Sequence, residues 1–337
     1  MIRSLSLSQS LAVPVLAVMA LAMALTGCDS LANIAYDTGL RAETSRARLA
    51  GHTLTVPART DDAAITWHYL ASQGFHSDRD DDERPVVLLL HGFGADSSNW
   101  LRMVIELKHD VDFVVPDLPG HGASGGDIDT DYRLARQAQR LLSLMSRLDV
   151  AQFHVVGNSM GGAIGLEMAR LAPESVLTLG LINSAGITLQ TPEFSALLSE
   201  GEENPLIPRD VAGFRETLTW AMAEPPWLPG FFVRIMGEKK AANAARMDKV
   251  WADLGEDPAM ARGAELAAIS TPALVIWGDQ DRLLSNDNAA QFVEYLPHSQ
   301  KLMLAGIGHA PMVEAPRETA RALRAFWREQ ASAADHN

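Results

Sequence analysis

Residues 153–171 read FHVVGNSMGGAIGLEMARL, and this stretch decides the fold. The apolar run Phe153–Val156 predicts a buried strand, and Gly162–Leu171 predicts a helix. The turn between them has the pattern Gly-x-Ser-x-Gly, in which the glycines leave room for a sharp reversal that lifts the serine hydroxyl to the tip of a sheet. Because a strand and a helix flank this pattern, we expect Ser159 to be a nucleophile.

Short apolar runs of the same kind recur along the rest of the chain. They cover 53–56, 65–70, Val86–Leu90, Asp112–Val115, Leu177–Ile182, Ala273–Trp277 and Lys301–Leu304. Helical patterns such as Leu134–Leu148 separate several of these runs. Unalternating apolar strands with helices between them are typical of a parallel sheet that is covered on both faces. The sequence therefore predicts the α/β class, with a doubly wound and mostly parallel sheet.

One long segment departs from this alternation of strands and helices. Residues 186–263 contain no apolar strand run, but they include several tryptophans and phenylalanines and a cluster of prolines at 225, 226 and 229. Open α/β sheets bind their ligands beyond the carboxyl ends of the strands, and long insertions at that edge are often functional. We therefore expect a helical cap, or lid, over the site.

Composition excludes several classes of protein. The 337 residues are 47% apolar and 21% charged, which is typical of a globular chain with one large domain plus an insertion, or with two domains. The formal net charge of −14 gives no electrostatic reason to expect nucleic acid as a partner. A single cysteine permits neither an intramolecular disulfide nor a cysteine-based zinc site.

The N-terminus has the features of an export signal over residues 1–27. Arg3 is its one charged residue, and the apolar stretch Leu11–Leu25 is shorter than the ~20 residues that a spanning helix needs. The sequence Leu-Thr-Gly-Cys ending at Cys28 resembles the lipobox of bacterial lipoproteins. This resemblance implies lipid attachment at Cys28 and a membrane-anchored protein of the bacterial cell envelope that faces the periplasm or the exterior. An ordinary signal peptide with a free Cys28 is the alternative.

Residues 31–50 mix apolar and basic positions at helical spacing. This spacing predicts a short helix. We therefore expect residues 28–50 to form a tether and a lead-in helix.

A serine hydroxyl is a weak nucleophile until a base takes its proton, and an acid must orient that base. His309 follows the last strand run, and Asp281 follows the run before it, so both are expected at the same sheet edge as Ser159. Asp279 lies beside Asp281 and is a second candidate for the acid.

Acyl transfer also needs two hydrogen-bond donors for the oxyanion of the tetrahedral intermediate, and losing one typically costs ~2.7–4 kcal/mol of barrier. The backbone N–H of Met160, next to the nucleophile, is one candidate. The other is the N–H of Phe93, in the loop after the run that ends at Leu90. We expect His91, in the same loop, to brace it by hydrogen bonding.

Nearly the whole chain after residue 50 resembles the α/β-hydrolase superfamily. The matching motifs are HGFG (91–94), PDLPGHGAS (116–124), GNSMGG (157–162), GDQD (278–281) and GHAPMVEAP (308–316). Within that superfamily, the chain is similar to the branch of monoacylglycerol lipases and bacterial lipases. The segments that carry this similarity are HGFGADSSNW (91–100), INSAGI (182–187), ENPLIPRD (203–210) and PPWLPGFF (225–232).

The resemblance implies a carboxylic-ester hydrolase of the α/β-hydrolase fold, with no metal or organic cofactor. It assigns the nucleophile to Ser159, the base to His309, the acid to Asp281 rather than Asp279, and the oxyanion donors to Phe93 and Met160. It also implies a core over 51–185, a helical cap over 186–263 and a second part of the core over 264–330.

The cap is the main guide to the substrate. Trp227, Phe231 and Phe232 are close enough in sequence to form a wide apolar face for an acyl chain or a bilayer, although packing of the lid onto the core is an equal interpretation. With the implied membrane anchor, this favours monoacylglycerols or other medium-chain acyl esters.

Two alternative functions share features with this sequence. A carbon–carbon hydrolase of ring-cleavage products shares the GNSMGG turn, but that branch usually carries Trp where Ala310 stands. An inactive hydrolase-fold lipoprotein of the envelope would lack part of the site, whereas every element is present here.

Overall fold

The computed structural model describes residues 29–57, 64–75, 84–187, 190–260 and 262–334; Cys28 and the predicted signal peptide lie outside them. One eight-stranded sheet has the order β1-β2-β4-β3-β5-β6-β7-β8. Its strands are β1 (Leu49–Val56), β2 (Ile65–Ser72), β3 (Val86–Leu90), β4 (Asp112–Pro116), β5 (Phe153–Asn158), β6 (Val176–Ile182), β7 (Ala273–Gly278) and β8 (Ser299–Leu304). Strands β3 to β8 are parallel to one another, β2 pairs antiparallel with β4, and β1 pairs antiparallel with β2. The predicted mostly parallel sheet is confirmed.

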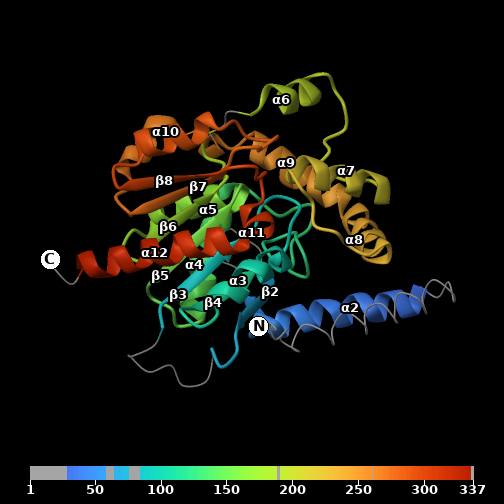
Figure 1. The fold of residues 1–337 in the computed structure, drawn as a ribbon, viewed down its shortest axis with the longest axis horizontal. Helices are drawn as coiled ribbons and strands as arrows, with labels where there is room; N and C mark the ends of the chain where they lie inside the picture. The colour runs from blue at the N-terminus through green and yellow to red at the C-terminus, as the bar shows by residue number, and fades with distance from the viewer. Residues whose placement is uncertain (1–28, 58–63, 76–83, 188–189, 261, 335–337) are drawn as a thin grey trace, which may run out of the picture.

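Helices cover both faces of this sheet (Figure 1). Along β3, Leu88 and Leu90 belong to the apolar cluster under α4 (Leu134–Arg147), α5 (Met160–Leu171) and α10 (Asp287–Tyr295). Val87 and Leu89 belong to a second cluster under α3 (Leu101–Leu107) and α12 (Pro316–Ala334). Successive side chains of a strand point to opposite faces, so the two clusters lie on opposite sides of the sheet. This is the doubly wound arrangement.

The strand sequences reflect their positions in the sheet. All five residues of the central strand β3, VVLLL, are buried. Strand β8 has the sequence SQKLML, in which no residue is buried, and it lies at the edge of the sheet. A lysine on an edge strand disfavours pairing with another chain, so the polar character of β8 follows from its place.

The N-terminal helix is shorter than the sequence pattern predicts. Helix α2 covers Asp29–Arg46, and Leu49 already pairs with Ser72 in the sheet, so the expected helix over 31–50 is wrong in its last residues. Arg48 has a left-handed φ of 56°, which ends the helix and turns the chain into β1. In the described residues, no helix is both long and apolar enough to cross a membrane.

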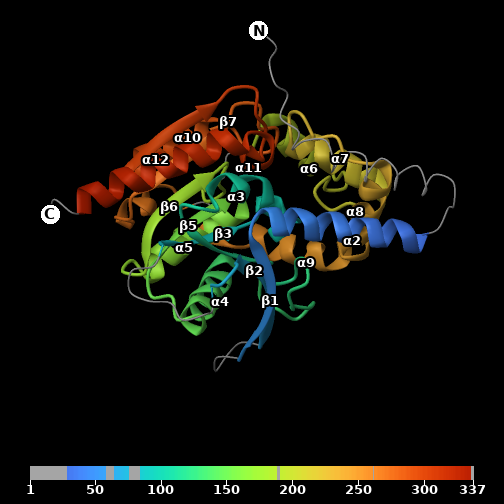
Figure 2. The same cartoon turned by 60° about the horizontal axis from the view of Figure 1, so that its bottom comes forward.

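Four helices lie between β6 and β7: α6 (Pro192–Ser199), α7 (Val211–Ala221), α8 (Gly230–Ala242) and α9 (Ala244–Gly255), followed by the short 3₁₀ helices η2 (Pro258–Met260) and η3 (Gly263–Ala268). Figures 1 and 2 show them together at one end of the molecule, with α2 alongside α8. The predicted helical insertion is therefore present. Its exact boundaries, 186 and 263, stay a prediction.

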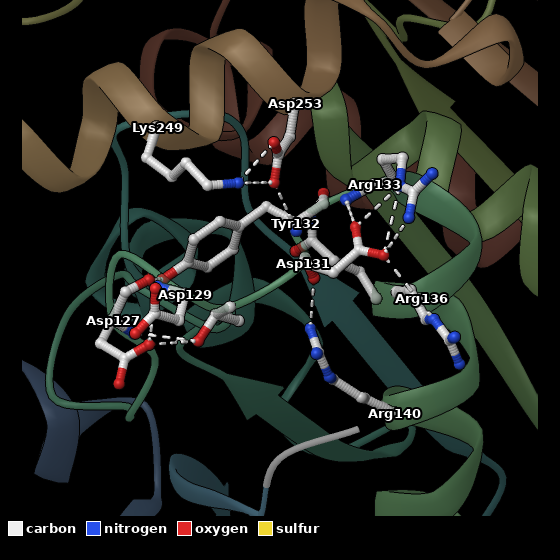
Figure 3. A network of polar contacts seen from close by, with 11 residues as sticks. Asp127, Asp129, Asp131, Tyr132, Arg133, Arg136, Arg140, Lys249 and Asp253 are labelled. Carbon is white, nitrogen blue, oxygen red and sulfur yellow. Dashed lines mark hydrogen bonds and ion pairs between the residues drawn. The ribbon is translucent and has the colours of Figure 1, made fainter. Parts of the chain in front are cut away.

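Two carboxylates join the cap to the core. Asp253 of α9 accepts a hydrogen bond from the backbone N–H of Tyr132 at 2.9 Å and pairs with Lys249 at 2.6 Å (Figure 3). Asp257, just after α9, accepts one from the N–H of Leu134 at 2.6 Å. Leu134 is the first residue of α4, whose N-terminal N–H groups have no partner within the helix. Asp257 therefore caps a core helix from the cap.

Replacing Asp257 by Ala should lower the free energy of unfolding by about 1–2 kcal/mol, because the N–H of Leu134 then loses its acceptor and the helix dipole loses its anion. Urea denaturation measures this difference. The exposed neighbour Glu256, replaced by Ala, is the matched control and should change the stability by less than about 0.5 kcal/mol. Equal effects of the two replacements would show that Asp257 does not act as a cap.

A buried histidine makes stability depend on pH. His154 of β5 is 8% exposed, packs against Trp327 and contacts the Thr178 hydroxyl at 2.8 Å. Burial lowers the pKa of His154 to about 4. Between the ordinary pKa near 6.5 and this value, the unfolded chain binds a proton that the folded protein does not. The contribution of His154 to stability is therefore present at neutral pH and is lost as the pH falls.

The free energy of unfolding should fall more steeply between pH 6.5 and 4 in the wild type than in His154→Gln. One such group changes the slope by at most ~1.4 kcal/mol per pH unit. Urea titrations at a series of pH values measure both slopes, with the exposed His298 replaced by Gln as the control. Parallel curves for wild type and His154→Gln would contradict the proton linkage.

Candidate active site

The turn between β5 and α5 holds Ser159 in a strained conformation. Ser159 has φ 54° and ψ −120°, a region that residues other than glycine rarely adopt. A Cβ on Gly157 would collide with the backbone of Gly161, and one on Gly161 would collide with the carbonyl of Leu90. The Ser159 N–H donates to the carbonyl of Ile182 at 3.1 Å. The partly exposed serine is thus held at the carboxyl end of β5, as the sequence pattern predicts.

A histidine–carboxylate pair lies at the same edge of the sheet. The Nδ1 of His309 is 2.7 Å from the Oδ2 of Asp281, and both residues are more than nine-tenths buried. With Nδ1–H donating to Asp281, the Nε2 of neutral His309 is the acceptor that can take a proton. Asp279 is engaged elsewhere, because its Oδ1 accepts from the N–H of Gly306 at 2.7 Å. Asp281, the acid that the family resemblance favours over Asp279, is thus the one that contacts the histidine.

Both oxygens of the Asp281 carboxylate accept hydrogen bonds. Its Oδ1 accepts from the backbone N–H groups of Leu283 and Leu284 at 2.8 and 3.1 Å. Its Oδ2 accepts from the Nδ2 of Asn183 at 2.7 Å as well as from His309. These bonds keep a buried carboxylate in a single orientation, which a residue that orients a base requires.

Two asparagines that the sequence reasoning did not single out connect the strand ends. Asn158 donates from Nδ2 to the carbonyl of His309 at 2.9 Å, so the residue next to Ser159 holds the histidine loop. Asn183 has a φ of 40°, is fully buried, and accepts the N–H of Gly278 while donating to Asp281. Asn183 lies in the motif INSAGI, which is the sequence feature that could have identified it.

The loop after β3 lies against the serine. A Cβ on Gly92 would stand 3.2 Å from the Cβ of Ser159. Met160 is the first residue of α5, and its N–H and that of Phe93 donate no hydrogen bond within the described part of the chain. Two backbone donors are therefore available beside Ser159, as an oxyanion site requires.

His91 braces this loop from inside the core. Its Nε2 accepts the N–H of Leu118 at 2.9 Å, which leaves Nδ1–H to donate to the carbonyl of Gly92 at 2.8 Å. Complete burial lowers its pKa, so the ring is neutral. Both ring nitrogens are engaged, which fits a bracing role and leaves neither free to act as a base.

The aromatic residues of the cap divide between two places. Trp227 is 85% exposed. The ring of Phe232 packs in a tilted orientation against Tyr36 of α2, with ring centroids 4.5 Å apart, and its centroid lies 6.0 Å from that of Phe231. The three cap residues chosen from the sequence thus lie at the surface or beside α2. They are not among the aromatic side chains that contact the loop after β3.

A different aromatic cluster faces that loop. The ring centroids of Trp251 and Phe93 are 5.3 Å apart. The ring centroid of Phe194 lies 6.4 Å from that of Trp251 and 5.7 Å from that of Trp220. This cluster places apolar surface of the cap beside the candidate oxyanion donor. Helical spacing could not reveal it, because its members come from β3's loop and three separate helices.

The comparisons with known proteins agree with this geometry. The model of the alpha/beta hydrolase fold family matches residues 85–316. Lipase 3 of Moraxella sp. is 32% identical over 252 residues, which are 74% of this chain and 80% of that protein. A monoacylglycerol lipase of Bos taurus is 29% identical over 254 residues, which are 72% of this chain and 75% of that protein.

The structure also resembles a crystal structure described as a membrane phospholipase A and a bacterial virulence factor. The TM-score is 0.82 at 30% sequence identity, and the match covers 95% of this chain and 98% of that one. With a family model spanning well over half of the chain and a buried site at the expected edge of the sheet, this protein belongs to the α/β-hydrolase fold family.

Proposed function

We propose that this enzyme hydrolyses carboxylic esters of lipids, with Ser159 as nucleophile, His309 as base and Asp281 as orienting acid. The observation that carries the proposal is the buried His309–Asp281 pair, 2.7 Å apart, at the sheet edge where the strained turn presents Ser159. The similarity to lipases supports ester hydrolysis over other reactions of the fold.

The proposed reaction proceeds in two halves. The Nε2 of His309 takes the proton of the Ser159 hydroxyl as Oγ attacks the ester carbonyl, and the N–H groups of Phe93 and Met160 stabilise the oxyanion. The C–O bond to the alcohol breaks, and His309 returns the proton to the leaving alcohol. Water then attacks the acyl-enzyme with the same base, releasing the carboxylic acid and free Ser159.

Monoacylglycerols or other medium-chain acyl esters are the proposed substrates. The aromatic cluster of Phe93, Phe194, Trp220 and Trp251 offers an apolar surface next to the reacting carbonyl. Burying each CH₂ of an acyl chain there would contribute about 0.8 kcal/mol, so affinity should rise with chain length. The names of the similar lipases support the same substrate class.

Ser159→Ala should reduce ester turnover by roughly six orders of magnitude, because the members of such a triad act as a unit. The assay uses p-nitrophenyl esters and monoacylglycerols of increasing chain length, with a dienoate ring-cleavage product and a phospholipid as contrasts. The control is Ser143→Ala, because the Ser143 hydroxyl donates to the carbonyl of Gln139 within α4. Loss of fluorophosphonate labelling in Ser159→Ala alone is expected; retained labelling or a preference for the dienoate would refute the proposal.

We also propose that the enzyme is exported and held at a membrane of the bacterial cell envelope through lipid attached to Cys28. The support is the lipobox-like sequence that ends at Cys28, directly before the start of α2 at Asp29. An attached diacylglycerol would keep the enzyme among lipid esters, at a high local concentration of substrate.

In Cys28→Ser the mature protein should disappear from the membrane fraction, because the thioether cannot form on serine. We expect the variant either as a soluble chain or as a longer precursor that keeps its signal peptide. Fractionation with metabolic labelling by a fatty acid measures this. Asp29→Ser, which keeps the cysteine, is the control for a changed residue at the same place. A Cys28→Ser protein that stays in the membrane fraction as mature chain would refute the anchor.

A further inference from the structure

One ion pair joins the cap directly to the loop that carries the candidate oxyanion donor. Lys240 of α8 lies 2.9 Å from the Oδ2 of Asp96, and the two side chains are 22% and 24% exposed. Asp96 stands three residues after Phe93. Among the ion pairs of the described residues, this one alone connects the cap with residues 91–96.

The two oxygens of Asp96 have separate tasks. Oδ1 accepts from the N–H and hydroxyl of Ser98 and so caps the 3₁₀ helix η1 (Ser97–Trp100), while Oδ2 meets Lys240. Burial by itself would raise the pKa of Asp96, but Lys240 and the Ser98 bonds outweigh it and hold the pKa well below its usual range. The carboxylate is therefore charged throughout the working pH range, and its bond to Lys240 is charge-assisted.

Packing at this contact is incomplete. A cavity of about 20 Å³ lies beside it and is lined by Gly94, Ala95, Lys240, Asn243 and Met247 among others. Such a volume can hold about one water molecule. Polar contacts therefore contribute to the separation between the loop and α8 beside this cavity, and the Lys240–Asp96 pair is one of them. Asn243, which donates to the carbonyl of Gly120 at 3.0 Å, fixes the end of the same helix on the neighbouring loop.

We propose that Asp96 and Lys240 are a positioning pair, through which the cap holds the loop 91–96 in the geometry of an oxyanion site. The pair rests on the proposed function, since it acts through the N–H of Phe93. Because Lys240 belongs to α8 and Asp96 to the loop, this contact places the cap and the candidate oxyanion donor relative to one another.

The variants are chosen to change the pair and nothing else. Asp96→Asn keeps an oxygen for Ser98 and removes the charge, and Lys240→Met keeps the length of the side chain without the ammonium group. The double variant completes a thermodynamic cycle, and Lys240→Arg tests rescue. Arg209→Met is the matched control, because Arg209 pairs with Asp248 at 2.8 Å inside the cap and does not reach the loop.

The readouts separate positioning from folding. Active sites are counted with a fluorophosphonate, and kcat and KM for p-nitrophenyl butyrate are expressed per active site. The affinity for an alkyl boronic acid reports the oxyanion site, because its tetrahedral adduct with serine resembles the transition state. For Asp96→Asn and Lys240→Met we expect a ~10- to 100-fold lower kcat, a KM within about threefold of the wild type, and a parallel loss of boronic acid affinity.

The double variant should be no worse than either single one, Lys240→Arg should recover most of the activity, and Arg209→Met should match the wild type. Single variants with kcat and boronic acid affinity within twofold of the wild type would overturn the proposal, as would additive losses or an equal loss in Arg209→Met. A wild type that neither labels nor hydrolyses esters would refute the proposed function instead. The two failures are therefore distinguishable.

Discussion

The backbone turn at Ser159 is the constraint on which the rest of the site depends. Its positive φ is costly for a residue with a side chain and persists only where the surroundings determine it completely. Here the N–H of Ser159 bonds to Ile182, and its carbonyl accepts from Gly162 and Ala185. Gly161 of the turn also lies so close to the carbonyl of Leu90 that a Cβ there would collide with it, so the turn packs directly against the end of β3.

The strand ends are then joined by two buried amides. Asn158 links the serine turn to the backbone of His309, and Asn183 links β6 to Gly278 and to the Asp281 carboxylate. A planar amide offers donors and an acceptor in fixed directions without adding charge, which suits the buried edge of a parallel sheet. The three candidate catalytic residues come from different loops, and these side-chain bonds hold the loops together.

The cap adds apolar surface to this polar centre. It shares a buried apolar cluster with the core, to which it contributes residues such as Met247 and Leu254, and it is also joined to the core by carboxylates. Asp253 and Asp257 accept hydrogen bonds from the backbone N–H groups of Tyr132 and Leu134 at the start of α4, and Asp96 on the core side meets Lys240 of the cap. Charged contacts of this kind are directional, so they fix the orientation of the segments that they join. The cap is thus joined to the core by polar contacts at both α9 and α8.

Local sequence alone determined the serine turn, the strand runs and the helical cap, because apolar runs and glycine spacing act over a few residues. It failed at the end of α2, where pairing of Leu49 with Ser72 overrides helical spacing. The family resemblance already favoured Asp281 over Asp279 as the partner of His309, and the two side chains are in contact in the structure. Only the tertiary structure decided that Trp251 faces the loop while Phe232 meets α2. Those choices depend on which distant segments pack together, and no local pattern encodes the partners.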